Sequence, residues 1–263
     1  MPWSLTNVHL LLPGFALVLF RIAGLMLVAP LFGSSAIPVR LKVALALTIA
    51  AVVFPLVGPS LPAEITLGTA LVGVVGEMSI GLVIGLGVSL IVLGVQLAGL
   101  LIGQQAGIAL ASVIDPTHGG STTVVGQVYM IVTLLIFLGL GGHRMLIAAL
   151  LDTFAVIPVL SFSVGDSTLL MTADLLSAAY ILAIKLFAPV LIALLLATVT
   201  MAFVSRTMPQ LNILSVGFAV RSMAAIGTAA LALAAAQDVL VAALTAALES
   251  VRATVGLGPL AVS

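Results

Sequence analysis

Residues 78–114 read MSIGLVIGLGVSLIVLGVQLAGLLIGQQAGIALASVI, an apolar stretch that contains no charged side chain. A membrane-spanning helix needs about 20 consecutive apolar residues to cross the ~30 Å hydrocarbon core of a bilayer. Strands of a membrane barrel would instead alternate apolar and polar residues over roughly ten positions. The stretch therefore predicts a long helix of an integral membrane protein.

The composition extends this prediction to the whole chain of 263 residues. Hydrophobic residues make up 63% of the chain and charged residues 6%, whereas a soluble domain carries about 25% charged residues. We therefore expect one membrane domain that covers residues 1–263. The net charge of zero gives no electrostatic basis for binding nucleic acid, and the absence of cysteine excludes disulfides and thiolate metal sites.

Proline and glycine residues divide the chain into about six apolar segments that we expect to be helices, so the predicted fold class is all-α. The segments cover residues 9–32, 40–57, 66–111, 122–141, 171–204 and 211–250. At 1.5 Å per residue the third segment would be about 68 Å long, more than twice the thickness of the hydrocarbon core. Either it breaks near Gly85-Leu-Gly87, or part of it projects beyond the membrane inside an assembly.

The third segment ends in a polar break, Ser112-Val-Ile-Asp-Pro-Thr-His-Gly-Gly-Ser-Thr-Thr123. Asp115-Pro116 must end a helix, because proline lacks an N–H and restricts the residue before it. Gly119-Gly120 then leaves the backbone free to take many conformations. A polar loop after so long an apolar run needs a wet or protein-lined place, and we expect the protein to work there.

One face of the third segment is rich in small and polar residues. At 100° per residue, seven positions fall within an arc of about 120°: Glu77, Gly81, Gly85, Gln96, Gly99, Gly103 and Gly107. Small residues four apart let helix backbones approach closely in lipid. One interpretation is helix packing alone, and the other is a tight seam between subunits around a conduit.

Isolated charged residues interrupt the apolar segments. A charge at the centre of a membrane helix costs about 2.5–3.5 kcal/mol on insertion scales, so such side chains normally face protein or water. Ion pairing inside the protein and snorkelling to the interface both explain them. The polar turn Pro209-Gln-Leu-Asn212 follows Arg206. The candidate structural polar residues are Arg21, Arg206, Gln210, Asn212 and Arg221.

Catalytic motifs are missing from the sequence. The three histidines, His9, His118 and His143, lie in separate segments without the spacing of a metal site. No G-x-S-x-G elbow is present for a serine nucleophile. We therefore expect the protein not to be an enzyme, with no catalytic residues, no metal site and no cofactor.

Several short motifs, taken together and in order, resemble the FliR family of flagellar type III export-gate proteins, whose injectisome counterpart is often called SctT. The resemblance covers nearly the whole chain. It rests on Arg21-Ile-Ala-Gly-Leu25, Ala29-Pro-Leu-Phe-Gly33, Ile37-Pro38, Gly76-Glu77, Gln96-Leu-Ala-Gly99, Gly103-Gln104, Ala111 to Pro116, Gly142-His143, Ile157-Pro158, Pro209 to Asn212 and Gly217-Phe218. The chain departs from the family at Gly217-Phe-Ala-Val-Arg221, where a proline and a lysine are usual, and at Thr117-His-Gly-Gly120.

The resemblance implies a subunit of a hetero-oligomeric export gate in the bacterial inner membrane, within the flagellar basal body. Its implied partners are FliP-like and FliQ-like gate subunits, FlhB-like and FlhA-like export components, membrane lipid and unfolded flagellar proteins in transit. The family's central loop acts as a plug in the export conduit. The matching residues here are Ser112, Asp115, Pro116, Thr117, His118, Gly119, Gly120 and Ser121.

Three other functions compete with a flagellar export gate. An injectisome export gate shares the same motifs and is the nearest alternative. A secondary transporter also has helices broken by glycine and proline, but it usually shows two similar halves, which this sequence lacks. An intramembrane protease would need a nucleophile elbow, which is also missing.

Overall fold

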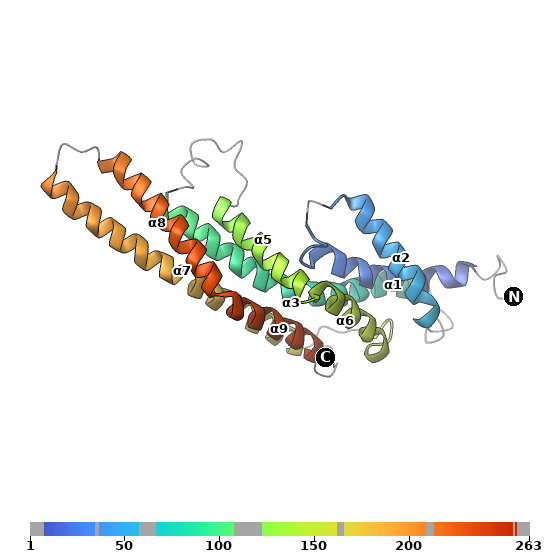
Figure 1. The fold of residues 1–263 in the computed structure, drawn as a ribbon. Helices are drawn as coiled ribbons and strands as arrows, with labels where there is room; N and C mark the ends of the chain where they lie inside the picture. Colours follow the sequence, from blue (N-terminus) through green and yellow to red (C-terminus); the bar gives the residue numbers. More distant parts are fainter. Residues whose placement is uncertain are drawn as a thin grey trace. The chain divides into compact units, whose positions relative to one another are not determined.

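The computed structural model describes residues 8–34, 37–57, 67–107, 123–161, 166–208 and 213–254, together with residue 256 (Figure 1). These residues form helices joined by turns, without a strand, which confirms the all-α fold class. The helices are α1 (Val8–Val28), α2 (Val39–Val57), α3 (Leu67–Gln105), α5 (Val124–Gly139), α6 (Gly142–Val156), α7 (Asp166–Thr207), α8 (Ile213–Ala235) and α9 (Gln237–Thr254).

The chain is organised as two compact units, each built from separate parts of the sequence. Unit 1 consists of Met1–Ser89, Gly141–Leu175 and Thr245–Ser263. Unit 2 consists of Leu90–Leu140 and Leu176–Leu244. Helices α3, α7 and α9 each contribute residues to both units.

In unit 1, α1 packs against both α2 and the first part of α3. The rings of Phe15 in α1 and Phe54 in α2 meet edge to face, with centroids 5.6 Å apart and planes at 80°. Aromatic pairs favour this arrangement because the positive ring edge meets the negative face. Fully buried aliphatic side chains from α1 and α3 form the core beneath them, among them Leu17, Ile22 and Ile84.

In unit 2, α5 lies against α8, and α7 and α8 are also neighbours (Figure 1). The hydroxyl of Tyr129 in α5 donates a hydrogen bond of 2.9 Å to the carbonyl oxygen of Ala229 in α8. Both Tyr129 and the nearby Phe137 are buried. A buried tyrosine hydroxyl normally finds such a partner, because an unpaired polar group is costly away from water.

Local chemistry fixes several helix ends. Thr123 caps α5, since its hydroxyl accepts a hydrogen bond of 3.1 Å from the N–H of Gly126. Gly107 follows the end of α3 with a φ of 80°, and Gly141 precedes α6 with a φ of 69°. Glycine takes these left-handed conformations without the steric cost that a Cβ would bring.

The structure corrects several expected boundaries. Helix α3 is continuous through Gly85 and Gly87, so the first of the two alternatives for the third segment, a break at this point, is wrong. The helix also ends at Gln105, short of the expected 111. A separate helix, α6, follows the predicted break at Gly141-Gly142 and was not expected.

Two further boundaries differ in the C-terminal half. Helix α7 begins at Asp166, before the expected 171. The segment expected over residues 211–250 is divided into two helices, α8 and α9, which meet at Ala236. Proline and glycine gave the positions of most breaks, but they do not mark the junction at Ala236.

Four helices in the described part of the chain are long and apolar enough to cross a membrane. They are Val39–Val57, Gly68–Gln105, Thr168–Thr207 and Val216–Ala235. The pair α5 and α6 together gives a possible fifth span, and Leu12–Val28 is a shorter apolar helix. Large apolar side chains on these helices are also exposed, for example Leu56 and Val72. Such surfaces suit lipid or other apolar helices, as the composition predicts.

Candidate functional site

Arg21 and Glu77 form a buried ion pair in unit 1. Arg21 lies in α1 and Glu77 in α3, and both side chains are almost completely shielded from solvent. The Nε–H of Arg21 donates a hydrogen bond to Oε2 of Glu77, with a distance of 2.5 Å. A buried charge needs such a partner, because removing one member of the pair leaves the other charge uncompensated.

The remaining polar atoms of the pair bind the end of α6 and the turn that follows it. Nη1 of Arg21 donates to the hydroxyl of Thr153, and both Nη atoms donate to the carbonyl oxygen of Ile157, all at 3.2 Å. Oε1 of Glu77 accepts a hydrogen bond of 2.9 Å from the backbone N–H of Leu160. The pair therefore joins three segments that are far apart in the sequence.

An aromatic ring covers the guanidinium group. The Cζ atom of Arg21 lies 4.3 Å from the centroid of the Phe154 ring, within the range of a cation–π interaction. Leu160, whose N–H reaches Glu77, has a φ of 73°. A left-handed conformation is unfavourable for leucine, so the surrounding contacts hold the turn in place.

Three glycines let α1 and α3 approach closely enough for this pair to form. A Cβ atom at Gly81 would overlap the carbonyl oxygen of Arg21, and one at Gly24 would overlap that of Met78. A Cβ at Gly85 would lie 2.9 Å from the backbone nitrogen of Ala29. The two backbones are in contact here, and this contact holds Arg21 and Glu77 in position.

The same face of α3 continues in unit 2, where it contacts α5. A Cβ at Gly99 would overlap the Cα of Gly126, and a Cβ at Gly103 would lie 2.5 Å from the side chain of Thr123. The glycines of α3 thus allow close packing against the chain's own helices in both units. A contribution of this face to contacts with partner subunits remains a prediction.

The other expected members of this face have different surroundings. The side chain of Gln96 is half-buried, and a Cβ at Gly126 would lie 3.3 Å from the Gln96 carbonyl oxygen. Gly107 lies beyond the end of α3, where its N–H donates to the carbonyl oxygen of Gln104 at 3.1 Å. Gly107 therefore belongs to the turn after the helix rather than to its packing face.

The predicted plug residues lie outside the described part of the chain, but both flanking helices are described. Thr123 accepts the capping bond from Gly126 and also donates a hydrogen bond of 2.9 Å to the carbonyl oxygen of Gly99. Residues 108–122 therefore link the end of α3 to Thr123, and the Thr123 side chain is hydrogen-bonded to α3.

Arg221 in α8 binds the C-terminus of α3. Its Nη2–H donates a hydrogen bond of 2.7 Å to the carbonyl oxygen of Gln105, the last residue of that helix. The last carbonyl groups of a helix lack partners within it, and the helix dipole favours a positive charge at this end. Arg221 supplies both the hydrogen bond and the charge.

A hollow of about 530 Å³ surrounds this contact in unit 2. Residues of α3, α7 and α8 line it, among them Gln104, Ser205 and Phe218. The motif residues Gln104, Gly217-Phe218 and Arg221 are far apart in the sequence, yet all of them line this hollow at the C-terminal end of α3.

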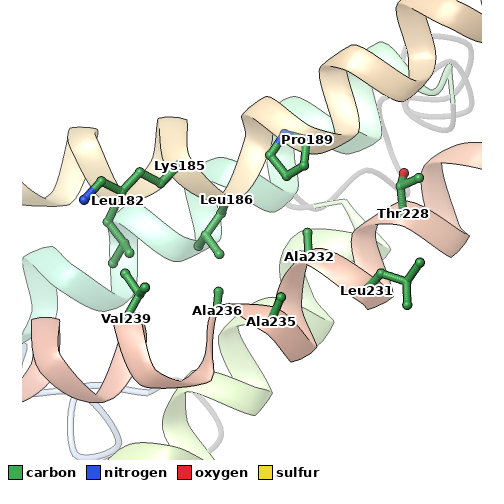
Figure 2. Close-up of a pocket in the computed structure, with 10 residues that line it drawn as sticks. All are labelled: Leu182, Lys185, Leu186, Pro189, Thr228, Leu231, Ala232, Ala235, Ala236 and Val239. Carbon is green, nitrogen blue, oxygen red and sulfur yellow. The ribbon is translucent and has the colours of Figure 1, made fainter.

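A second hollow in unit 2, of about 500 Å³, lies between α7 and the junction of α8 and α9 (Figure 2). Lys185 and Pro189 line it from α7, and small residues such as Ala232 and Ala236 face them. Pro189 has no N–H, so it cannot bond the carbonyl oxygen of Lys185 one turn earlier. None of the site residues predicted from the sequence lines this hollow.

The remaining candidate polar residues are only partly described. Arg206 is exposed in the last turn of α7, where a positive charge complements the helix dipole. Gln210 and Asn212 lie outside the described residues. Sequence reasoning missed the partners of the buried pair, namely Thr153, Ile157 and Leu160. No local pattern identifies them, because two of the three contribute backbone atoms.

Comparison with known proteins gives a consistent group of relatives. The family described as "Bacterial export proteins, family 1" matches residues 12–247. The chain is 32% identical to the flagellar biosynthetic protein FliR of Bacillus subtilis over 210 residues, which cover 79% of this chain and 81% of that protein. It is 33% identical to the FliR protein of Pectobacterium carotovorum over 201 residues, or 75% of this chain and 76% of that protein.

A protein with a different name also matches. The Yop proteins translocation protein T of Yersinia pestis is 27% identical over 186 residues, which cover 70% of this chain and 71% of that protein.

Proposed function

Because this chain belongs to family 1 of the bacterial export proteins, we propose that it is a structural subunit of the flagellar type III export gate. In this role it lines a conduit for unfolded flagellar proteins, and the segment between α3 and α5 plugs that conduit when it is closed. The proposal joins the family membership to the arrangement of the two helix ends.

Family membership also bears on two predictions from the sequence, namely that the chain is not an enzyme and that it lies in the inner membrane. The family is one of export proteins and its named relatives are biosynthetic and translocation proteins, which confirms that the chain is not an enzyme. The long apolar helices together with this family confirm a multi-pass protein of the bacterial inner membrane. A secondary transporter is no longer needed to explain the glycine-rich helices.

The observation that carries the plug proposal is the hydrogen bond from Thr123 to the carbonyl oxygen of Gly99. It ties the end of the polar segment to the helix from which the segment starts. The described residues on both sides of the segment therefore lie against the same helix, α3. Such a segment can obstruct small solutes and still yield to a passing polypeptide.

The relative identities support a flagellar rather than an injectisome role. Identity to FliR proteins reaches 32% and 33%, although it falls to 26% for FliR of Buchnera aphidicola, and the Yersinia protein is 27% identical. The preference rests on the upper end of the FliR range. An injectisome gate is the second candidate because that match also covers most of the chain. Expression of this chain in a FliR-deficient bacterium should restore swimming and flagellin export. Restored effector secretion in an injectisome mutant without restored swimming would favour the second candidate.

The proposed partners are FliP-like and FliQ-like gate subunits, with FlhB-like and FlhA-like components beside them. The exposed apolar faces of α7 and α8, which include Ile192, Leu195 and Met223, offer surface for such helices. Purification of the tagged chain should recover these subunits in one large complex. A stable complex that contains only copies of this chain would contradict the assignment.

Deleting residues 112–121 tests the plug directly. In energised cells that hold an assembled gate, the deletion should increase the leakage of small ions severalfold, because nothing would then obstruct the closed conduit. Co-purification of partner subunits must be unchanged, so that a leak is not caused by a missing gate. Unchanged permeability in an assembled gate would show that the segment is not a plug.

A further inference from the structure

We propose that the hollow shown in Figure 2 binds an anionic phospholipid, whose phosphate group pairs with Lys185 and whose acyl chain covers the apolar floor between α7 and the junction of α8 and α9. We refer to it as the Lys185 hollow. Every residue that lines it is described and belongs to unit 2. The site goes beyond the proposed gate function, and it is independent of which export system the chain serves.

Lys185 supplies a cation that has no counter-charge in the described part of the chain. Its side chain is exposed on α7, and it forms no ion pair with another described residue. Asp238 is the acidic residue among those described in unit 2, but it is exposed in the first turn of α9 and does not pair with Lys185. The ammonium group is therefore free to bind an anion from outside the chain.

The floor of the Lys185 hollow is apolar and partly uncovered. Leu182 and Leu186 line it from α7 and are buried. Leu231 of α8 and Val239 of α9 also line it, but they are 72% and 41% exposed. Small side chains at the helix junction leave the floor open, namely Ala232, Ala235 and Ala236. A hydrocarbon chain would remove this surface from water, whereas a free inorganic anion would leave it uncovered.

The two ends of the hollow differ in polarity. Figure 2 shows the Lys185 side chain running along α7 toward Leu182, so that its nitrogen lies at the end away from Thr228. The hydroxyl of Thr228 already donates a hydrogen bond of 2.6 Å to the carbonyl oxygen of Ala224, so that end offers no free donor. A ligand that matches the hollow therefore has a charged head at Lys185 and an apolar tail that extends toward Thr228.

The length of the uncharged stretch after Lys185 places this residue at the surface of a bilayer. Residues 186–205, 20 in all, carry no charge and end before Arg206. At 1.5 Å per residue they span about 30 Å, the thickness of the hydrocarbon core. Lysine and arginine at the ends of such a span extend to the headgroups. The Lys185 ammonium then lies at the level of the phosphates, and Pro189 lies in the hydrocarbon, as the orientation of the hollow requires.

Helix α8 agrees with this placement. Ser205 of α7 and Arg221 of α8 line one hollow of unit 2, whereas Lys185 and Val239 line the other, so α7 and α8 are antiparallel there. Residues 222–237 carry no charge, and Asp238 follows beside Val239. The charged residues of the two helices thus gather at the same two levels.

An apolar partner helix that carries one carboxylate would also match the charge of the hollow. A cation at the centre of a membrane would need such a protein partner, because no lipid headgroup reaches it. A cation at the level of the phosphates does not, since the anionic lipids of the membrane surface surround it and attract lysine and arginine. The position of Lys185 therefore favours the phospholipid.

Charge and space in the hollow can be changed separately. Lys185→Met removes the charge and keeps a long apolar side chain, whereas Lys185→Arg keeps the charge. Arg206→Met is the matched control, because Arg206 is an exposed cation at the other end of the same stretch and lines neither of these two hollows. Ala235→Leu fills the floor from an exposed position. Ala234→Leu is its control, because Ala234 is also exposed but does not line the Lys185 hollow.

The test measures lipid binding by the full-length chain, purified in detergent, with native mass spectrometry. The wild-type chain should bind phosphatidylglycerol severalfold better than phosphatidylcholine, whose headgroup has no net charge. Lys185→Met should abolish this preference, and Ala235→Leu should reduce phosphatidylglycerol binding severalfold. Lys185→Arg, Arg206→Met and Ala234→Leu should bind like the wild type. A preference that survives Lys185→Met, or undiminished binding in Ala235→Leu, would overturn the proposal.

Two further measurements separate the phospholipid from other ligands. Phosphatidylglycerol should raise the unfolding temperature of the wild-type chain, because it binds the folded state, and inorganic phosphate should not. Equal stabilisation by inorganic phosphate would indicate a simple anion site and overturn the lipid assignment. If Lys185→Met loses its partner subunits in cells while the purified variant binds phosphatidylglycerol normally, the hollow belongs to an acidic partner helix instead.

Discussion

The side chains of Arg21 and Glu77 form an ion pair across 56 positions of sequence, and neither is accessible to solvent. Each charge stabilises the other in a place where an isolated charge would be costly. Together with Thr153, Ile157 and Leu160, the pair fixes α1, α3 and the end of α6 in unit 1.

Breaking this pair from one side should destabilise unit 1. Glu77→Gln leaves Arg21 buried without a counter-charge, and the expected loss in the free energy of unfolding is about 3–5 kcal/mol. The loss can be measured by thermal or denaturant unfolding of the purified protein in detergent.

Changing both residues provides the control. The double variant Arg21→Met with Glu77→Leu removes both charges and keeps similar volumes, so its loss should be much smaller than that of Glu77→Gln. Equal losses in the single and double variants would show that the ion pair itself is not what holds these segments.

Gly81→Ala should disturb the crossing of α1 and α3. The added methyl group would overlap the carbonyl oxygen of Arg21, so the two backbones must move apart. Overpacking of this kind costs about 1–3 kcal/mol, and it would also stretch the Arg21–Glu77 bond.

Gly227→Ala in α8 is the matched control. A Cβ at Gly227 meets nothing within 4 Å, and alanine is a better helix former than glycine. Its unfolding temperature should therefore stay the same or rise slightly, while that of Gly81→Ala falls. A similar fall in both variants would contradict the role given to the close approach.

The sequence was enough to predict that α1 and α3 each carry one buried charge, but not that the two would meet. Both lie in apolar segments, but a separation of 56 positions gives no indication that the two side chains are partners. The decisive contacts come from Ile157 and Leu160, which offer only backbone atoms. Such contacts leave no pattern in residue types, so only the fold shows them.

Tyr129→Phe should weaken the contact between α5 and α8. The hydroxyl of Tyr129 donates to the carbonyl oxygen of Ala229, and both side chains are buried. Loss of one such bond costs about 0.5–1.5 kcal/mol. Tyr180→Phe is the control, because Tyr180 is exposed on α7. Unfolding in detergent should separate the two variants, and equal stabilities would mean that the hydrogen bond contributes little.

Gly141→Ala should strain the turn between α5 and α6. Gly141 has a φ of 69°, a conformation that costs other residues about 1–2 kcal/mol. Gly139 lies two residues earlier, inside α5 and with open space around it, so Gly139→Ala should be neutral or stabilising. Gly141→Asn should fall between them, since asparagine tolerates this conformation best after glycine. The unfolding temperatures of the three variants check the order.

The glycine positions illustrate what periodicity can and cannot predict. Spacing along α3 placed Gly81, Gly85, Gly99 and Gly103 on one face, and the structure shows a close neighbour at all four. The neighbour is backbone at the first three and the side chain of Thr123 at Gly103. Spacing did not indicate which helices approach that face. In the structure α1 approaches it in unit 1 and α5 in unit 2. It also placed Gly107 on the helix, although the chain has already turned there. Periodicity describes one helix, whereas its ends and neighbours depend on residues elsewhere.

The long separation between Arg21 and its partners has a consequence for how the protein is made. A ribosome that adds roughly 5–20 residues per second completes Glu77 about 3–11 s after Arg21, because the two are 56 positions apart. The carbonyl oxygen of Ile157 follows 136 positions after Arg21. During that interval a newly synthesised α1 carries a guanidinium group with no counter-charge, so it is a poor membrane anchor by itself. A chain truncated before α3 keeps that defect permanently, which distinguishes an incomplete product from a finished one in the membrane.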